Sequence, residues 1–321
     1  MLIIYAGINY RCSGVVGSAL SERFLEMGMT VSCLDICRLD EAWRLARIRD
    51  RVKYVWKASN DILCEDLQNV DVVIDAGLGV ADRPLGNASP SHTITSNILP
   101  PFHLLDTIRR MDVSDMPILI YPSSFNTLYG HKSGSTYDSG MLPNPSSVYG
   151  WTKAATELLC MTYHKAHNVP CIVTRVGSGY GARMRSDELP ARLILNTLMD
   201  RKICLRSPGA KRLWTYGPDI INFYEKLMNN LEEYVGQTLH CAGNADNRIV
   251  TNTELASLIS EISGKHVEIV PGPYEAGEII HGKPISFEIN TDSPLWKPQF
   301  TLWEGMKKTT EWFKDNLSRY S

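Results

Sequence analysis

The sequence predicts an α/β fold, a doubly wound parallel sheet followed by a smaller, interleaved α/β region. Short apolar runs alternate with helical patterns through the first two-thirds of the 321 residues, and this alternation is typical of βαβ units. A glycine-containing turn follows the first apolar run, and an acidic residue ends the second. After about residue 176 the alternation loosens and prolines interrupt it.

The expected strands are short, and several are continuous apolar runs, as in parallel strands that are buried on both faces. They lie at residues 2–6, 30–35, 52–55, 70–75, 118–121 and 171–175. Helical periodicity between them predicts helices near 15–28, 92–111, 148–167 and 188–201. Because parallel neighbours need a crossover connection, this order implies right-handed βαβ units in one sheet.

Two further helices are expected in the C-terminal region. The first spans 253–263 and opens with the cap-like run Asn252-Thr253-Glu254. The second has four apolar residues on one stripe: Leu302, Met306, Phe313 and Leu317. We interpret Trp296 and Trp312 as core residues of this region.

Composition excludes several classes of protein. Hydrophobic residues make up 44% and charged residues 21%, and the net charge of −2 gives no electrostatic reason to bind nucleic acid or an anionic membrane. No apolar stretch approaches the ~20 residues that span a bilayer, and we interpret the N-terminal residues as a strand, not a signal peptide. The eight cysteines form no CxxC pair, which argues against a metal site and favours reduced thiols in the cytoplasm.

The glycine turn predicts a nucleotide site. Gly7 ends the first strand, and Gly14-Val15-Val16-Gly17 opens the next helix, where glycines let the backbone approach a pyrophosphate. Asp35 ends the second strand, and a carboxylate there binds ribose hydroxyls and favours NAD over NADP. The stretch between Gly7 and Gly14 is long, and it is either a surface bulge or a loop that brings Arg11 to a cofactor phosphate.

Tyr149 and Lys153 form the candidate catalytic pair. They stand four residues apart in a predicted helix and therefore share one face of it. A free tyrosine titrates near ~10 and is a poor base at neutral pH, but a nearby ammonium favours the phenolate. Beside a dinucleotide site, this pair indicates hydride transfer at a carbon that bears a hydroxyl.

Motifs along nearly the whole chain add to this pair. Asp61-Ile62 follows the third strand, and Ala76-Gly77-Leu78 follows the fourth. The run Ser123-Ser124 leads to Leu128-Tyr129-Gly130, and the tail carries Trp296-Lys297-Pro298 followed by Glu304-Gly305. With the glycine turn and the Tyr-Lys pair, these residues resemble the extended short-chain dehydrogenase/reductase family, in particular its NAD-dependent nucleotide-sugar epimerases and dehydratases.

The resemblance implies a Rossmann domain at residues 1–175 and a mainly substrate-binding region at 176–321, interleaved with it. NAD would contact Gly7, Gly14, Val15, Val16, Gly17, Asp35, Asp61, Ile62, Ala76, Gly77, Leu78, Tyr149 and Lys153. Tyr149 would be the base, Lys153 would lower its pKa, and Ser124 or Thr127 would orient the substrate oxygen. Ser178, Arg183 and Arg212 would contact a nucleotide-diphosphate sugar, although both arginines also suit a solvated surface. The helices at 92–111 and 148–167 would pair with their copies in a homodimer.

Departures from the family pattern leave the reaction open. Phe125 stands where the family usually has a serine or threonine, and Asn126-Thr127 stands where 4,6-dehydratases have an Asp-Glu pair. Ser178 replaces the family's asparagine, and Leu213 replaces the aspartate after Arg212. We therefore expect an NAD-dependent nucleotide-sugar epimerase of carbohydrate biosynthesis. The alternatives are an NAD(P)-dependent dehydrogenase or reductase, an atypical dehydratase, or a non-catalytic nucleotide sensor.

Overall fold

The computed structural model describes residues 2–5, 13–76, 89–125, 135–137, 141–266, 268–272, 287–289 and 295–320. Its main element is a seven-stranded sheet with the order β11-β7-β5-β4-β1-β2-β3. All six strand pairings in this sheet are parallel. The strands are β1 Leu2–Tyr5, β2 Val31–Asp35, β3 Lys53–Trp56, β4 Val72–Asp75, β5 Ile118–Ser124, β7 Cys171–Val176 and β11 Thr238–Cys241.

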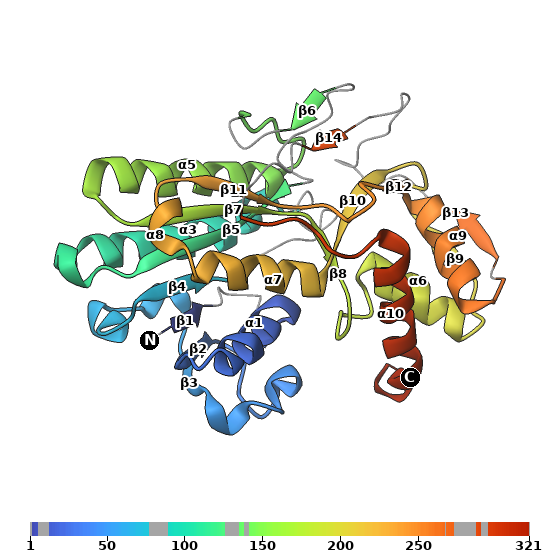
Figure 1. Cartoon of the computed structure of the whole chain (residues 1–321), viewed down its shortest axis with the longest axis horizontal. Coiled ribbons are helices and arrows are strands. Elements are labelled where there is room, and N and C mark those ends of the chain that lie inside the picture. Colours follow the sequence, from blue (N-terminus) through green and yellow to red (C-terminus); the bar gives the residue numbers. More distant parts are fainter. Residues whose placement is uncertain are drawn as a thin grey trace.

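Helices cover both faces of this sheet, so the doubly wound α/β fold is confirmed (Figure 1). Helices α1 (Val15–Glu26) and α7 (Gly217–Met228) lie on one face, and α3 (Pro90–Arg109) and α5 (Val148–His167) lie on the other. Because successive side chains of a strand point to opposite faces of the sheet, the strands contribute to two separate hydrophobic cores. Ile74, Ile120 and Ile172 pack toward α1 and α7, whereas the intervening residues Val73, Leu119 and Val173 pack toward α3 and α5.

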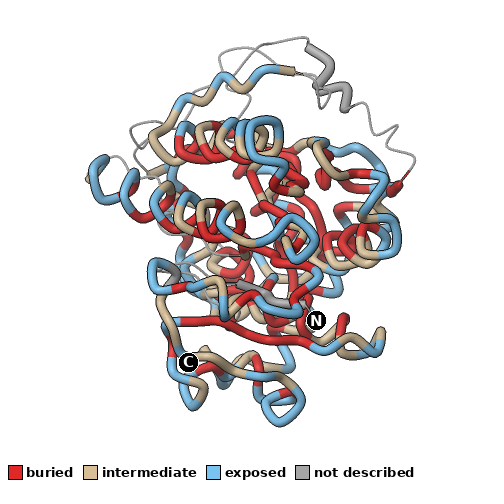
Figure 2. The backbone as a smooth tube through the Cα atoms, turned by 90° about the vertical axis from the view of Figure 1, so that its left-hand side faces the viewer, coloured by how far each residue is buried: buried red, intermediate tan, exposed pale blue. Residues whose placement is uncertain are grey.

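Burial follows the layers. Strands β2, β4 and β7 are buried along nearly their whole length, whereas the helices alternate buried and exposed residues (Figure 2). Continuous apolar runs predicted these strands correctly, because a strand between two helical layers has no solvent face. None of the described helices is both long and apolar enough to cross a membrane.

The chain returns to the large sheet after residue 176, through α7 and β11. Neither element was predicted. Pro218 looked like an interruption, but it lies at the start of α7, where its missing N–H costs no hydrogen bond. The run of β11, Thr-Leu-His-Cys, is only four residues long and half polar, so it lacks the apolar signal of the other strands.

A smaller body lies beyond the carboxyl ends of the large sheet (Figure 1). Helices α6 (Leu189–Leu198), α9 (Asn252–Ser263) and α10 (Leu302–Asp315) form it together with short strands. The pairings are β12-β10-β8, β13-β9 and β14-β6. These strands are β6 Ser135–Tyr137, β8 Ser178–Tyr180, β9 Ile203–Leu205, β10 Lys211–Tyr216, β12 Ile249–Thr251, β13 Ile269–Pro271 and β14 Phe287–Ile289. The short helix α8, Leu231–Tyr234, lies instead beside the large sheet, between α7 and β11 in the chain.

The tail motif anchors the C-terminal helix. The buried Asp219 carboxylate of α7 accepts hydrogen bonds from the backbone N–H groups of Gln299 (2.9 Å) and Phe300 (3.2 Å). A capping box of Thr301 and Glu304 then opens α10. Gly305 is needed at the next position, because a Cβ there would overlap the hydroxyl of Tyr180. The tail residues around Gly305 therefore pack against Asp219 and Tyr180, which lie far from them in the sequence.

Candidate active site

The candidate site lies where β2, β4, β5 and β7 end and where α1 and α5 begin. In open parallel sheets, ligands bind at the carboxyl ends of the strands. The glycine turn, Asp35, Ala76, Ser124 and the Tyr149–Lys153 pair all lie at this edge. Gly7, Gly77, Leu78 and Thr127 lie outside the described residues, so the parts assigned to them stay predictions.

The start of α1 fits a bound pyrophosphate. Gly14 is the N-cap residue, no side chain caps the helix, and its first turn carries no acidic residue. By contrast, the hydroxyl of Ser147 caps α5 by accepting from the Gly150 N–H at 3.1 Å. Within the part of the chain that the structure describes, the N–H groups that open α1 therefore have no side-chain acceptor at the cap, and the macrodipole there favours an anion.

Asp35 holds the glycine turn against the end of β2. Its buried carboxylate accepts from the backbone N–H of Ser13 (3.1 Å), from the Ser13 hydroxyl (3.2 Å) and from the Cys37 N–H (2.9 Å). This carboxylate therefore fixes the residue just before Gly14. A ribose contact by Asp35 stays a prediction, and it requires the same carboxylate to serve both partners.

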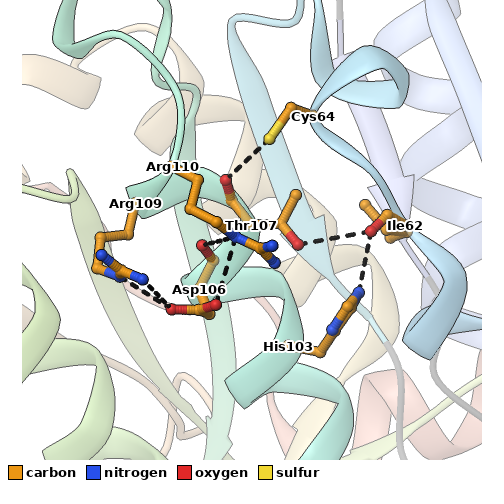
Figure 3. A network of polar contacts seen from close by, with 7 residues as sticks. All are labelled: Ile62, Cys64, His103, Asp106, Thr107, Arg109 and Arg110. Carbon is orange, nitrogen blue, oxygen red and sulfur yellow. Dashed lines mark hydrogen bonds and ion pairs between the residues drawn. The ribbon is translucent and has the colours of Figure 1, made fainter.

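The segment predicted to hold the adenine is fixed on α3 (Figure 3). The carbonyl of Ile62 lies 2.9 Å from Nε2 of His103 and accepts a longer bond from the Thr107 hydroxyl at 3.5 Å. The Cys64 thiol donates to the Thr107 carbonyl at 3.5 Å. Asp61 ends a short 3₁₀ turn, Ser59–Asp61, and is exposed. His103 of α3 therefore positions this loop.

Tyr149 is the second residue of α5, and the polar side chains around it fix its turn of the helix. The Thr152 hydroxyl donates to the Tyr149 carbonyl at 2.7 Å, and Asn97 of α3 donates from Nδ2 to the Thr152 hydroxyl at 3.0 Å. Asn97 stands seven residues before the pair Leu104-Leu105, and this helix resembles one that carries the same residues in the family. The contact of Asn97 with Thr152 shows how α3 supports the start of α5.

Lys153 is nearly enclosed, with 4% of its surface exposed. Its Nζ donates to the Pro122 carbonyl at 2.8 Å and lies 4.6 Å from the centre of the Tyr121 ring. Burial lowers the pKa of Lys153 from 10.5 to about 8, opposed by the negative charges of Asp75 and then Glu157. The ammonium is therefore held in place, and its charge depends on its surroundings.

Ser123 and Ser124, which end β5, face opposite sides of the sheet. Tyr121 packs with the α3 and α5 layer, and the residues two positions along a strand share a face, so Ser123 faces this layer. Ser124 belongs to the opposite face. Phe125 is buried beside Ala154 of α5 and Leu213, so the two departures from the family pattern pack against each other. The alternation of side chains along β5 therefore argues against Ser124 as the residue that orients the substrate oxygen. That role of Ser124 stays a prediction.

A buried ion pair that the sequence did not reveal lies behind Lys153. Glu157 of α5 and Arg175 of β7 are each 5% exposed, and Arg175 donates from Nε and Nη2 at 2.8–3.1 Å. The only signal was that Glu157 stands four residues after Lys153, on the same helix face. This pair fixes α5 to the sheet one turn beyond Lys153.

The residues predicted to contact substrate are spread over the smaller body. Ser178 lies in β8 beside Trp214 of β10, and Arg212 lies two residues before Trp214, with its guanidinium 5.7 Å from that ring. Arg183 is in an ion pair, because Nη1 and Nη2 donate to Glu22 of α1 at 2.8 and 2.9 Å. Its geometry links α1 to the segment after β8, and it offers no support for a phosphate contact.

Comparison with known proteins identifies the family. The model of the NAD dependent epimerase/dehydratase family matches residues 12–242, which is more than half of the chain. The chain therefore belongs to the NAD-dependent epimerase/dehydratase family, as the sequence predicted, and NAD is the cofactor of that family.

Individual relatives are distant and of more than one kind. The chain is 24% identical to a dTDP-glucose 4,6-dehydratase of Neisseria gonorrhoeae, over 96% of this chain and 95% of that protein. It is also 24% identical to a UDP-glucuronate 4-epimerase of Thermodesulfobacterium geofontis, over 95% of both chains. Among solved structures, the UDP-glucuronic acid 4-epimerase of Bacillus cereus with UDP-glucuronic acid and NAD superposes with a TM-score of 0.83, at 24% identity and over 98% and 100% of the two chains. These likenesses establish the fold but not the reaction.

Proposed function

We propose that this protein is an NAD-dependent epimerase of a nucleotide-activated sugar. The observation that carries the proposal is the enclosed Lys153, fixed by Pro122 and Tyr121 one helical turn from Tyr149. A lysine on a solvated helix face would have neither contact. The fold and the family support the same assignment.

In the proposed reaction, Tyr149 removes the proton of a sugar hydroxyl. NAD, when bound, would supply the hydride chemistry at the same carbon, and Lys153 would hydrogen-bond its nicotinamide ribose. Lys153 keeps a positive charge near the phenol and so stabilises the phenolate. After the keto sugar has rotated to present its other face, Tyr149 returns the proton to the sugar oxygen as the carbon is reduced again. The net change is inversion at one carbon.

An atypical dehydratase is the second candidate, because a dTDP-glucose 4,6-dehydratase is among the relatives that span nearly the whole chain. Elimination of water also needs an acid for the departing hydroxyl. Asn126 and Thr127 stand where that subgroup has its Asp-Glu pair, and neither can serve as a carboxylic acid. The sequence therefore favours epimerisation.

We also propose a cytoplasmic homodimer that forms through α3 and α5. The large apolar side chains that they expose include Leu99 and Phe102 of α3 and Trp151 and Leu158 of α5. On each helix the two residues lie three or seven positions apart, so they form one stripe. Two such helices from each copy would bury these side chains in a four-helix bundle.

The test compares the wild type with Tyr149→Phe on UDP-glucuronic acid, UDP-glucose and dTDP-glucose. Epimer formation without net NADH supports the proposal, whereas loss of water or accumulation of NADH would identify a dehydratase or a dehydrogenase. Tyr149→Phe should lower turnover by at least ~100-fold with little change in NAD affinity. Full activity in that variant would refute the catalytic assignment, and NAD binding without any turnover would favour a sensor.

A further inference from the structure

Titratable or charged groups from three strands and from its own helix surround Lys153. One of these groups, Asp75, has no part in the proposed reaction. The groups around Lys153 are Asp75 of β4, Tyr121 of β5, Arg175 and Cys171 of β7, and Tyr149, Glu157 and Cys160 of α5. Glu157 is bound by Arg175 through two nitrogens. Asp75 is the other carboxylate of this set, and its surroundings bear on the charge of Lys153.

Asp75 faces the catalytic helix. Val73 packs with the α3 and α5 layer, and Asp75, two residues further along β4, shares that face. Ile74 pairs with Ile120 in the parallel register, so Asp75 lies level with Tyr121 on the neighbouring strand. Neighbouring strands are ~4.8 Å apart. Tyr121, whose ring is 4.6 Å from the Lys153 ammonium, is thus the neighbour of Asp75 on the adjacent strand and on the same face.

Asp75 is also buried, with 2% of its surface exposed. A buried carboxylate is costly unless charge or hydrogen bonds compensate it, and the same holds for a buried ammonium. Asp75 gives the strongest of the favourable charge effects that raise the pKa of Lys153 against its burial. Each group therefore reduces the cost of burying the other.

We propose that Asp75 is a positioning residue of the site, the counter-ion that keeps the Lys153 ammonium charged and held against Tyr121 and Pro122. It acts through Lys153 and need not touch the substrate or the cofactor. The catalytic consequence rests on the proposed function, because a charged Lys153 matters to turnover only if Tyr149 is the base. The electrostatic link between the two residues is independent of any reaction.

The test measures the titration of Lys153 directly. The full chain is labelled with ¹³C-lysine, the Cε signal of Lys153 is assigned by its loss in Lys153→Met, and its pH midpoint is compared among variants. Asp75→Asn should move the midpoint down by about one unit or more, and Asp75→Glu should restore most of it. Asp71→Asn is the matched control, because Asp71 precedes the same strand at the opposite, exposed edge of the sheet. An unchanged midpoint in Asp75→Asn would overturn the proposal.

A reciprocal measurement covers the case in which Asp75→Asn fails to fold. Thermodynamic linkage requires Lys153 to shift the titration of Asp75 by the same amount. In Lys153→Met, labelled with ¹³C-aspartate, Asp75 should titrate at a higher pH than in the wild type. An unchanged Asp75 titration would refute the link, whatever the turnover assay shows. Turnover that persists in Tyr149→Phe would instead refute the proposed function and leave the link intact.

Discussion

Replacement of Lys153 by Met should stabilise the folded protein at neutral pH. Lys153 is buried, and its pKa falls from 10.5 to about 8. A lysine whose pKa is lowered on folding destabilises the protein wherever it is charged in the unfolded chain. At about 1.4 kcal/mol for each unit, this difference corresponds to a cost of about 3 kcal/mol below pH 8.

Methionine has a similar length and no charge, so it removes this cost. The Pro122 carbonyl loses the hydrogen bond from Nζ, which costs about 1 kcal/mol. The expected net gain is therefore about 2 kcal/mol at pH 7. The gain should shrink as the pH rises from 8 toward 10.5, because the wild-type lysine then loses its proton in the unfolded chain as well.

Urea denaturation at pH 7 and at pH 10 would measure both effects. Lys165→Met is the control, because Lys165 is an exposed residue of the same helix, and it should change the free energy of unfolding by less than about 0.5 kcal/mol at either pH. Activity should be lost in Lys153→Met alone. A Lys153→Met protein that is less stable than the wild type at pH 7, or whose difference from it does not vary with pH, would refute the reasoning.

Two further predictions concern packing and assembly. Gly305→Ala should destabilise the protein by about 1–3 kcal/mol, because the added methyl overlaps the Tyr180 hydroxyl; thermal unfolding measures this, and the double variant with Tyr180→Phe should recover part of the loss. Leu158→Asp, at a side chain that is 63% exposed, should yield a monomer in sedimentation velocity without loss of folding. A Leu158→Asp protein that keeps the mass of the wild type, or a monomeric wild type, would contradict the proposed interface.

Much of the large sheet was predictable because most of its strands meet one simple condition. A strand between two helical layers is largely apolar on both sides, and all six predicted strands were correct to within one to three residues at their ends. The helices α1, α3, α5 and α6 were predicted in the same way, from a period near 3.6. The prediction missed α7 and β11, whose local sequences are ambiguous and whose conformation depends on the sheet they join.

The sequence by itself determined the class of site. The glycine turn, Asp35 and the four-residue spacing of Tyr149 and Lys153 are local features, and a parallel sheet brings strand ends and helix starts to one edge. These residues do lie at that edge. Periodicity tells which face of a helix a side chain occupies, and this was enough to predict that Tyr149 and Lys153 share one face of α5.

Only the tertiary structure decided which residues of other elements pack against each face of a helix or strand. The contacts of Lys153 with Tyr121 and Pro122, and the ion pair of Glu157 with Arg175, join residues 18 to 32 positions apart. Arg183, expected at a phosphate, is bound to Glu22 across 161 positions. Such partners are set by the order and register of the strands, which no local pattern encodes. The charge of Lys153 therefore depends on the packing of the whole sheet.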